Sequence, residues 1–245
     1  MKKWSWLAAC LLYATTAAAD LDELVFITEE YPPYNFKRNG ELQGISVDIL
    51  SAIFAVTNTG LTRDDIHVLP WARGYETALS QPNTVLFSTT RTQAREHLFK
   101  WVGPIARDRV TLIARRDRHI TIDSIMDLNT SDYQIAVIRE DIGAQRLSEA
   151  NVDPERVLPA ISNTSALRML NHGRVDLWAY SEDVAFWIME ENGLKVSNFE
   201  SIYTLSESYL YFALHPSTDD RLVDAMQAAL NSLREQGTID DIMRR

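Results

Sequence analysis

Arg95 and the hydroxyl residues before it are the residues best suited to chemistry in this chain. Ser88, Thr90 and Thr92 stand at and just beyond the end of an apolar, strand-like run. A guanidinium binds a carboxylate through two parallel charge-assisted hydrogen bonds, and hydroxyls with backbone N–H groups at a helix start complete an anion site. The residues favour such a site, although Ser88 and Thr90 are equally suited to ending a strand and capping a helix.

Tyr31 and Trp71 are candidates for the apolar walls of a ligand site. Trp71 follows Leu69-Pro70 at the expected end of a strand, the place where ligands bind in open α/β sheets. Tyr31 stands in a turn, and the alternative is an aromatic ring that rests on the core. Arg73 follows closely on Trp71, and we expect its side chain to be exposed.

Motifs for catalysis are sparse. The sequence has no phosphate-binding glycine loop, no Gly-x-Ser-x-Gly and no His-Glu-x-x-His. The five histidines are scattered, and the single cysteine excludes a thiolate zinc site. Nothing in the sequence demands an enzyme, so we expect no catalytic residue, no metal ion and no cofactor.

Composition limits the class of partner. Lys and Arg number 24 against 34 Asp and Glu in 245 residues, a formal charge of −10. A nucleic-acid partner requires a basic surface, so this surplus of acid argues against one. The hydrophobic share of 46% is ordinary for a globular protein with a sizeable core.

The N-terminus reads as a secretory signal peptide over residues 1–19. Lys2 and Lys3 precede an apolar run, and Ala17 and Ala19 provide the Ala-x-Ala pattern of a cleavage site before Asp20. The run is shorter than the roughly 20 residues that span a bilayer. A lipoprotein cysteine at Cys10 is the alternative, but too little apolar sequence precedes it. We therefore predict a periplasmic protein without a lipid anchor.

The elements that must position the candidate residues alternate between strand and helix, which indicates an α/β fold. We expect strands over 24–28, 66–69 and 84–88 and a helix near 93–99. The pattern restarts at about 115 and ends in a strand over 209–214 and a long striped helix. One continuous sheet and two separate α/β clusters both remain open on this periodicity.

Several stretches in order resemble the bacterial family 3 solute-binding proteins, the periplasmic receptors for polar amino acids. The resemblance is carried by these segments: Tyr31-Pro-Pro-Tyr-Asn-Phe36 with Gly44-Ile-Ser-Val-Asp-Ile49, Leu69-Pro-Trp-Ala-Arg-Gly-Tyr-Glu-Thr-Ala-Leu79, and Phe87 to Arg95 with Phe99 to Ile105. It is specific over about 31–105 and weak after about 130.

The resemblance implies the fold of a type II periplasmic binding protein, with two lobes and a ligand cleft between them. Two hinge strands, expected at 110–115 and 209–214, would cross between the lobes. Lobe 1 would then comprise 20–110 and 209–245, with lobe 2 over 111–208. The final helix would return to lobe 1.

The same resemblance implies roles for individual residues. Arg95 matches the carboxylate-binding arginine, and Ser88, Thr90 and Thr92 fall at hydroxyl positions of the site. In lobe 2, Gly143 alone preserves exposed backbone N–H groups at a helix start. Ser181 stands where the family carries an aspartate for the ligand ammonium, and Glu182 or Asp183 are possible substitutes that also favour a helix start.

We therefore predict a monomeric, exported receptor that captures a small, amino-acid-like carboxylate for the permease of an ABC-type transporter. One alternative is a signalling receptor that presents the ligand to a sensor protein. Another is a periplasmic cyclohexadienyl or prephenate dehydratase on the same scaffold, with Glu182 or Asp183 as its general acid.

Overall fold

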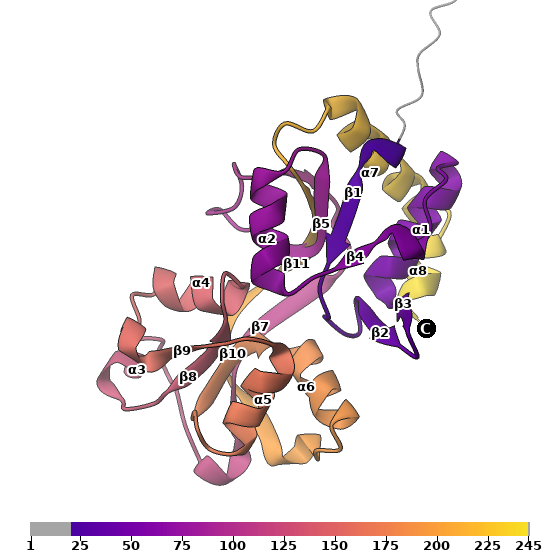
Figure 1. Ribbon diagram of the computed structural model, residues 1–245. Helices are drawn as coiled ribbons and strands as arrows, with labels where there is room; N and C mark the ends of the chain where they lie inside the picture. The colour runs from indigo at the N-terminus through magenta and orange to yellow at the C-terminus, as the bar shows by residue number, and fades with distance from the viewer. Residues whose placement is uncertain (1–20, 245) are drawn as a thin grey trace, which may run out of the picture.

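The computed structural model describes residues 21–244, which form two α/β lobes joined by two long strands (Figure 1). The predicted signal peptide and Cys10 lie outside these residues. Within 21–244, none of the helices combines the length and hydropathy that crossing a membrane requires.

Lobe 1 is built on parallel strands. β1 (Val25–Thr28) lies between β4 (His67–Val68) and β5 (Thr84–Thr90), in parallel with both. The helices of this lobe are α1 (Ile45–Thr57), α2 (Trp71–Ser80), α7 (Asp220–Glu235) and α8 (Thr238–Met243). Short additional strands complete it: the hairpin of β2 (Phe36–Arg38) and β3 (Glu41–Gln43), and β6 (Lys100–Val102).

Lobe 2 repeats the arrangement. β8 (Ile135–Ile138) lies in parallel with β9 (Val157–Ala160) and β10 (Leu177–Ser181). Its helices are α3 (Asp127–Thr130), α4 (Ile142–Glu149), α5 (Asn163–Asn171) and α6 (Glu182–Glu191). Short 3-10 turns over the two lobes are Leu21–Glu23, Arg63–Asp65, Arg116–Arg118, Pro154–Arg156 and Val196–Asn198.

Two strands connect the lobes, β7 (Arg107–Arg115) and β11 (Phe199–Leu214). β11 pairs antiparallel with β7 up to Tyr209, and from Leu210 it pairs with β5 and β6 of lobe 1. One continuous order of hydrogen-bonded strands therefore runs through both lobes, and β11 is the strand that joins their sheets. The structure thus combines the two sequence interpretations, because it has two α/β clusters and one path of paired strands through both. The predicted strand over 209–214 is only the last part of β11.

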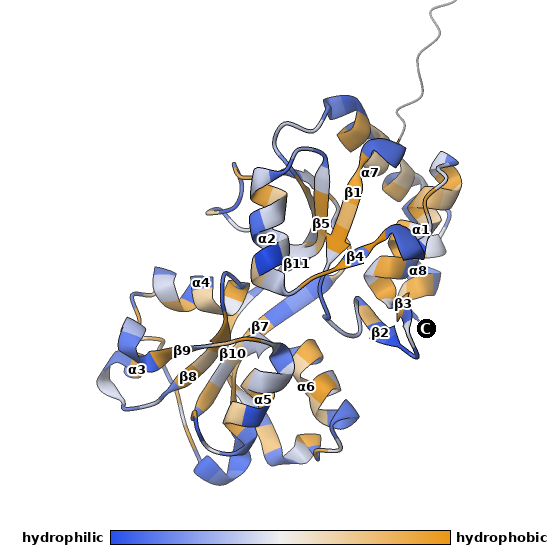
Figure 2. Cartoon of the chain, in the orientation of Figure 1, coloured by the Kyte–Doolittle hydropathy of each residue, from blue (hydrophilic) through white to orange (hydrophobic). Residues whose placement is uncertain are grey.

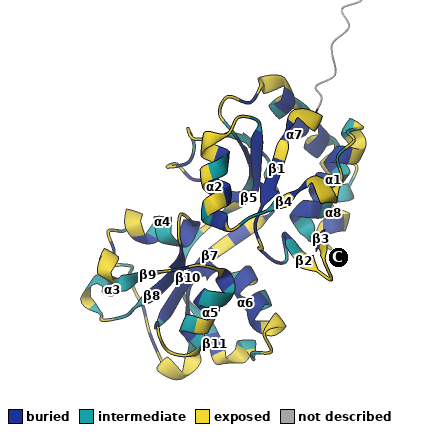
Figure 3. Cartoon of the chain, in the orientation of Figure 1, coloured by how far each residue is buried: buried dark blue, intermediate teal, exposed yellow. Residues whose placement is uncertain are grey.

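The packing explains why the striped helices form. The apolar positions of α1, Val47, Ile49, Leu50, Ile53 and Phe54, are all buried. α7 buries Leu222, Met226, Leu230 and Leu233 and packs on α1, so the last long helix does return to lobe 1. Asp219 caps α7, because its side chain accepts the Arg221 N–H at 2.9 Å. The parallel strands β5, β8 and β10 are largely apolar and buried, while the outer helix faces are polar and exposed (Figures 2 and 3).

The helix expected near 93–99 is absent from this part of the structure, which is a run of turns. Arg95 N donates to Thr92 O at 3.1 Å and Leu98 N to Arg95 O at 3.0 Å, spacings of three residues rather than four. The Glu96 carbonyl, which a helix would use internally, accepts the Trp101 indole N–H at 3.2 Å. Tertiary contacts therefore replace the helical hydrogen bonds.

Candidate functional site

The residues predicted from the sequence converge between the lobes. Every one of the following is buried: Tyr31, Trp71, Ser88, Thr90, Thr92, Arg95, Gly143 and Ser181. They come from the carboxyl ends of the parallel strands or from the segments directly after them, in both lobes. Because ligands bind at this end of open α/β sheets, we treat this cleft as the candidate ligand site.

The Arg95 guanidinium bridges the lobes. Its Nη1 donates to the Thr90 carbonyl of lobe 1 at 3.3 Å, and Nη2 to the Glu140 carbonyl of lobe 2 at 2.7 Å. Its central carbon lies 5.5 Å from the Trp71 ring centroid and 5.1 Å from that of Tyr75. A cation only 3% exposed is thus held by carbonyl oxygens and aromatic faces, which orients it for an anionic group.

The predicted hydroxyl residues differ in where they point. Thr92 Oγ1 accepts from Gln145 Nε2 of lobe 2 at 3.1 Å. Ser88 instead donates to Asn35 Oδ1 and lies 2.8 Å from Ser46 Oγ, within lobe 1. Thr90 contributes its carbonyl to Arg95. The Ser88 hydroxyl therefore supports the turn after β1, whereas the Thr92 hydroxyl faces the opposite lobe.

Tyr31 forms an aromatic wall that touches lobe 2. Its ring centroid lies 5.7 Å from that of Tyr180, nearly at right angles, and 5.8 Å from that of Tyr34. Its hydroxyl donates to Asp108 Oδ2 at 3.3 Å. Trp71 stacks on Tyr75 at 5.7 Å, and its buried indole N–H has no partner within residues 21–244.

Gly143 has a packing role at the start of α4. A Cβ at this position would lie 2.2 Å from the Ala179 carbonyl oxygen of β10, so only glycine permits this approach. Asp141 caps the same helix, with Oδ1 accepting the Ile142 N–H at 2.7 Å.

Ser181 stands where the resemblance implies an aspartate, and its hydroxyl contacts a carboxylate from another strand. Its hydroxyl donates to Asp108 Oδ1 at 2.6 Å, and Asp108 lies on the crossing strand β7. Glu182 is ion-paired with Arg109, and Asp183 is exposed and accepts from the Tyr34 hydroxyl at 3.3 Å. The carboxylate nearest to the position of Ser181 is therefore that of Asp108.

Three further acidic residues of the cleft were not singled out from the sequence: Glu29, Asp108 and Asp141. Each is at least nine-tenths buried, with exposures of 7%, 1% and 5%. Glu29 directly follows β1 and Asp141 precedes α4, both positions that point to a cleft. Asp108 gives no such signal, because it lies between two arginines that suggest a surface strand.

Burial shifts the pKa of all three carboxyls upward. It raises the pKa of Asp108 to about 6 against the hydrogen bonds from Ser181 and Tyr31. It raises the pKa of Asp141 to about 6, although the Ile142 N–H and the Arg95 charge act in the other direction. The pKa of Glu29 lies well above its ordinary value through burial and then the charges of Asp141 and Glu30.

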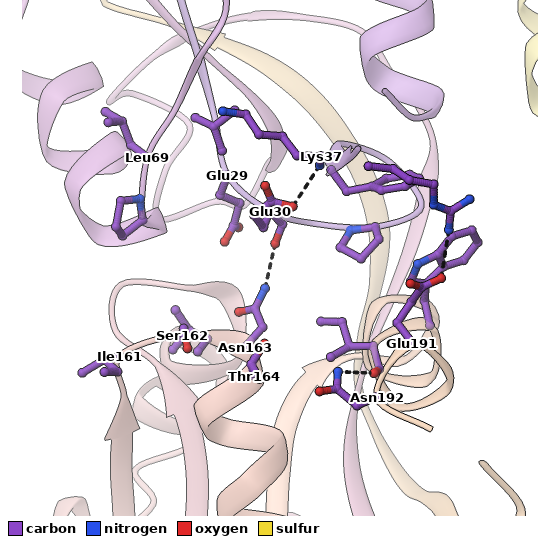
Figure 4. Close-up of a pocket in the computed structure, with 18 residues that line it drawn as sticks. Glu29, Glu30, Lys37, Leu69, Ile161, Ser162, Asn163, Thr164, Glu191 and Asn192 are labelled. Carbon is purple, nitrogen blue, oxygen red and sulfur yellow. Dashed lines mark hydrogen bonds and ion pairs between the residues drawn. The ribbon is translucent and has the colours of Figure 1, made fainter. Parts of the chain in front are cut away.

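Cavities flank this buried cluster on two sides. One, of about 520 Å³, is lined by Glu29 and Glu30 of lobe 1 and by Asn163 and Trp187 of lobe 2. Figure 4 shows Glu29 and Glu30 facing Asn163 across this gap, where Asn163 Nδ2 donates to the Glu30 carbonyl at 2.8 Å. The other, of about 870 Å³, is lined by Arg95 and Asp141 among others. Both fall in the size range of small-molecule sites.

The comparisons with known proteins agree with this geometry. A probable amino-acid-binding protein, YxeM of Bacillus subtilis (strain 168), is 22% identical over 253 residues, covering 98% of this chain and 92% of the relative.

Solved structures of low identity share the fold. A histidine kinase sensor domain with similarity to periplasmic binding proteins superposes with a TM-score of 0.79 at 21% identity, covering 90% of this chain and 94% of that one. A mutant of the arginine-binding protein ArgBP from T. maritima gives a TM-score of 0.76 at 19% identity, covering 91% and 94%. A Streptococcus pneumoniae ABC uptake transporter substrate-binding protein with bound histidine gives 0.75 at 15% identity, covering 90% and 91%.

Residues 24–245 match the bacterial extracellular solute-binding proteins, family 3. The two-lobe fold, the crossing strands and the interlobe cleft are those expected from the resemblance. This chain belongs to family 3 of the bacterial extracellular solute-binding proteins.

Proposed function

We propose that this protein is the periplasmic receptor of an ABC-type importer and that it captures a small solute with an amino-acid-like carboxylate. The observation that carries the proposal is the Arg95 guanidinium, which is buried in the cleft and bonded to carbonyl oxygens of both lobes. A carboxylate is a stronger acceptor than a carbonyl, so a solute carboxylate competes for these donors.

Binding then couples to lobe closure. A solute that contacts Arg95 from lobe 1 and the start of α4 from lobe 2 stabilises only the arrangement in which both lobes reach it. Closure buries the solute beside Tyr31 and Trp71, which supply apolar contact.

The experiment that tests the proposal compares Arg95→Ala with the wild type by titration calorimetry against a panel of amino acids, dicarboxylates and short peptides. Losing one partner of a buried charged pair is expected to cost at least about 2 kcal/mol, or about 30-fold in affinity. Arg91→Ala is the matched control, because Arg91 lies in the same segment but is exposed and ion-paired with Glu96. Wild-type affinity in Arg95→Ala would contradict the assignment.

A second candidate function is signalling, since the histidine kinase sensor domain shares this fold. The cleft chemistry is the same for both functions, so the test lies in the cell. Loss of solute uptake on deletion of the gene supports transport, whereas intact uptake with loss of a solute-dependent transcriptional response supports signalling.

A further inference from the structure

The cleft holds more buried negative charge than positive charge. Among residues 21–244, the buried charged side chains are Glu29, Asp108, Asp141 and Arg95. They belong to different parts of the fold: Glu29 follows β1 of lobe 1, Asp108 lies on the crossing strand β7, and Asp141 caps α4 of lobe 2. Three carboxylates and one guanidinium are therefore buried where the two lobes and the crossing strand meet.

The charges of the three carboxyl groups all act on one aromatic side chain, Tyr180, at the carboxyl end of β10. Burial raises the pKa of the Tyr180 hydroxyl first, and the charges of Glu29, Asp141 and Asp108 each raise it further. In a buried site of low dielectric these charges are only weakly screened. Tyr180 also contacts Tyr31 edge to face at 5.7 Å, so aromatic faces stand beside the carboxylates.

The hydrogen bonds of these carboxylates leave negative charge uncompensated. Both donors to Asp108, the hydroxyls of Tyr31 and Ser181, are neutral. Asp141 Oδ1 accepts a backbone N–H, while its buried Oδ2 has no hydrogen-bond partner within residues 21–244. A buried carboxylate without a cationic partner is costly, so the carboxylates that Arg95 does not compensate take up a proton or a cation.

We propose that the cleft selects a solute with two cationic groups, of the kind that a dibasic amino acid carries, and that Asp108 contacts one of them. This inference rests on the proposed function, in which Arg95 binds the carboxylate of the same solute. A solute with two cationic groups and one carboxylate brings one net positive charge to a cleft where one guanidinium faces three carboxylates, whereas a solute with a single cationic group and a carboxylate brings none. The rings of Tyr31 and Tyr180 favour an organic ammonium or guanidinium at this place.

Three probes of nearly equal shape test the inference by titration calorimetry with the wild-type protein: L-arginine, L-citrulline and agmatine. Citrulline replaces the guanidinium of arginine by a neutral urea, and agmatine lacks its carboxylate. We expect arginine to bind at least about 30-fold more tightly than citrulline, on the scale of one buried charge contact.

The outcomes separate the two proposals. Citrulline binding as tightly as arginine overturns the dicationic inference and leaves the amino-acid receptor intact. Agmatine binding as tightly as arginine supports the dicationic inference and contradicts the proposal that Arg95 binds a carboxylate of the solute. If neither arginine nor agmatine binds, the inference is overturned.

Asp108→Asn tests the role of Asp108. This isosteric change removes the charge and keeps one acceptor oxygen, while the amide NH2 replaces the other oxygen and faces a hydroxyl that can accept from it. We expect at least about a tenfold loss of affinity for arginine and a much smaller loss for citrulline. Asp183→Asn is the matched control, because Asp183 is an exposed carboxylate that bonds Tyr34. Equal losses of affinity for arginine and citrulline in Asp108→Asn would show that Asp108 does not contact the second cationic group and would overturn this part.

Discussion

Asp108 shows how one residue couples the hinge, the cleft and the ionisation of the protein. It lies on a strand that crosses between the lobes, yet its carboxylate bonds Tyr31 from lobe 1 and Ser181 from lobe 2. The family resemblance places an ammonium-binding carboxylate at the position of Ser181. Here a serine in that place leaves room for a carboxylate from β7, which comes within 2.6 Å of the serine hydroxyl.

The raised pKa of Asp108 makes a prediction for the stability of the unliganded protein. A rise from 3.8 to about 6 means that the folded state retains the proton more strongly than the unfolded state. The contribution of Asp108 to the unfolding free energy is fully present below the pKa of the unfolded state and is lost as pH rises through about 6. The change amounts to about 3 kcal/mol. Urea denaturation of Asp108→Asn and wild type at pH 5 and 8 checks this.

We expect the unfolding free energy of Asp108→Asn, relative to that of the wild type, to increase by more than about 1 kcal/mol from pH 5 to pH 8. The reason is that asparagine cannot ionise, so the variant escapes the loss that the buried carboxylate suffers at high pH. A difference in unfolding free energy that stays constant from pH 5 to pH 8 would contradict the raised pKa.

At the scale of elements, the start of α4 is defined by how closely it approaches β10. Asp141 caps the helix, and the absence of a side chain at Gly143 allows the Ala179 carbonyl to lie where a Cβ would otherwise be. This contact places Asp141 at the cleft. The sequence assigned Gly143 to the ligand through exposed N–H groups, and the structure adds a steric reason for a glycine there.

Gly143→Ala is therefore expected to destabilise the protein by about 2 kcal/mol or more, because helix or strand must shift to admit the methyl group. Gly60→Ala is the control, since a Cβ at Gly60 would meet only Asp22 Oδ2, at an ordinary 3.5 Å. Chemical denaturation of both variants gives the measurement. Equal stability of the two variants would show that α4 does not depend on this approach.

At the scale of the whole molecule, contacts at the wall of the smaller cavity also hold the lobes together. Phe36 of β2 packs on Trp187 of α6 with ring centroids 5.4 Å apart, and Arg38 pairs with Glu191 at 2.8 Å. The ion pair is exposed and adds little, whereas the aromatic pair contributes about 1 kcal/mol. Both contacts exist only when the lobes are close.

Phe36→Ala should accordingly weaken ligand binding by up to about fivefold, because about 1 kcal/mol of closed-state stabilisation is lost. Small-angle scattering of the unliganded variant should give a larger radius of gyration than the wild type. Glu41→Ala, an exposed change on the neighbouring strand β3, should do neither. An affinity loss in both variants alike would exclude lobe closure as the cause.

The alternation of strand and helix was readable from the sequence, because buried faces leave a local apolar period. The stripe of α7 and the strands β1 and β5 follow from it, whereas Arg95 became a candidate through the family resemblance. The hairpin of β2 and β3 and most of the 16-residue β11 do not, since β11 carries polar residues along an exposed part. Its pairing with β7 rather than any apolar period makes it a strand.

The sequence by itself determined the α/β class, the helix faces and, through the resemblance, a cleft with Arg95. Only the tertiary structure decided which carboxylates share that cleft. Glu29, Asp108 and Asp141 lie far apart along the chain, and Asp108 stands between two arginines in a pattern typical of a surface strand. Their burial comes from the approach of two lobes and a crossing strand, and such long-range packing leaves no local period to read.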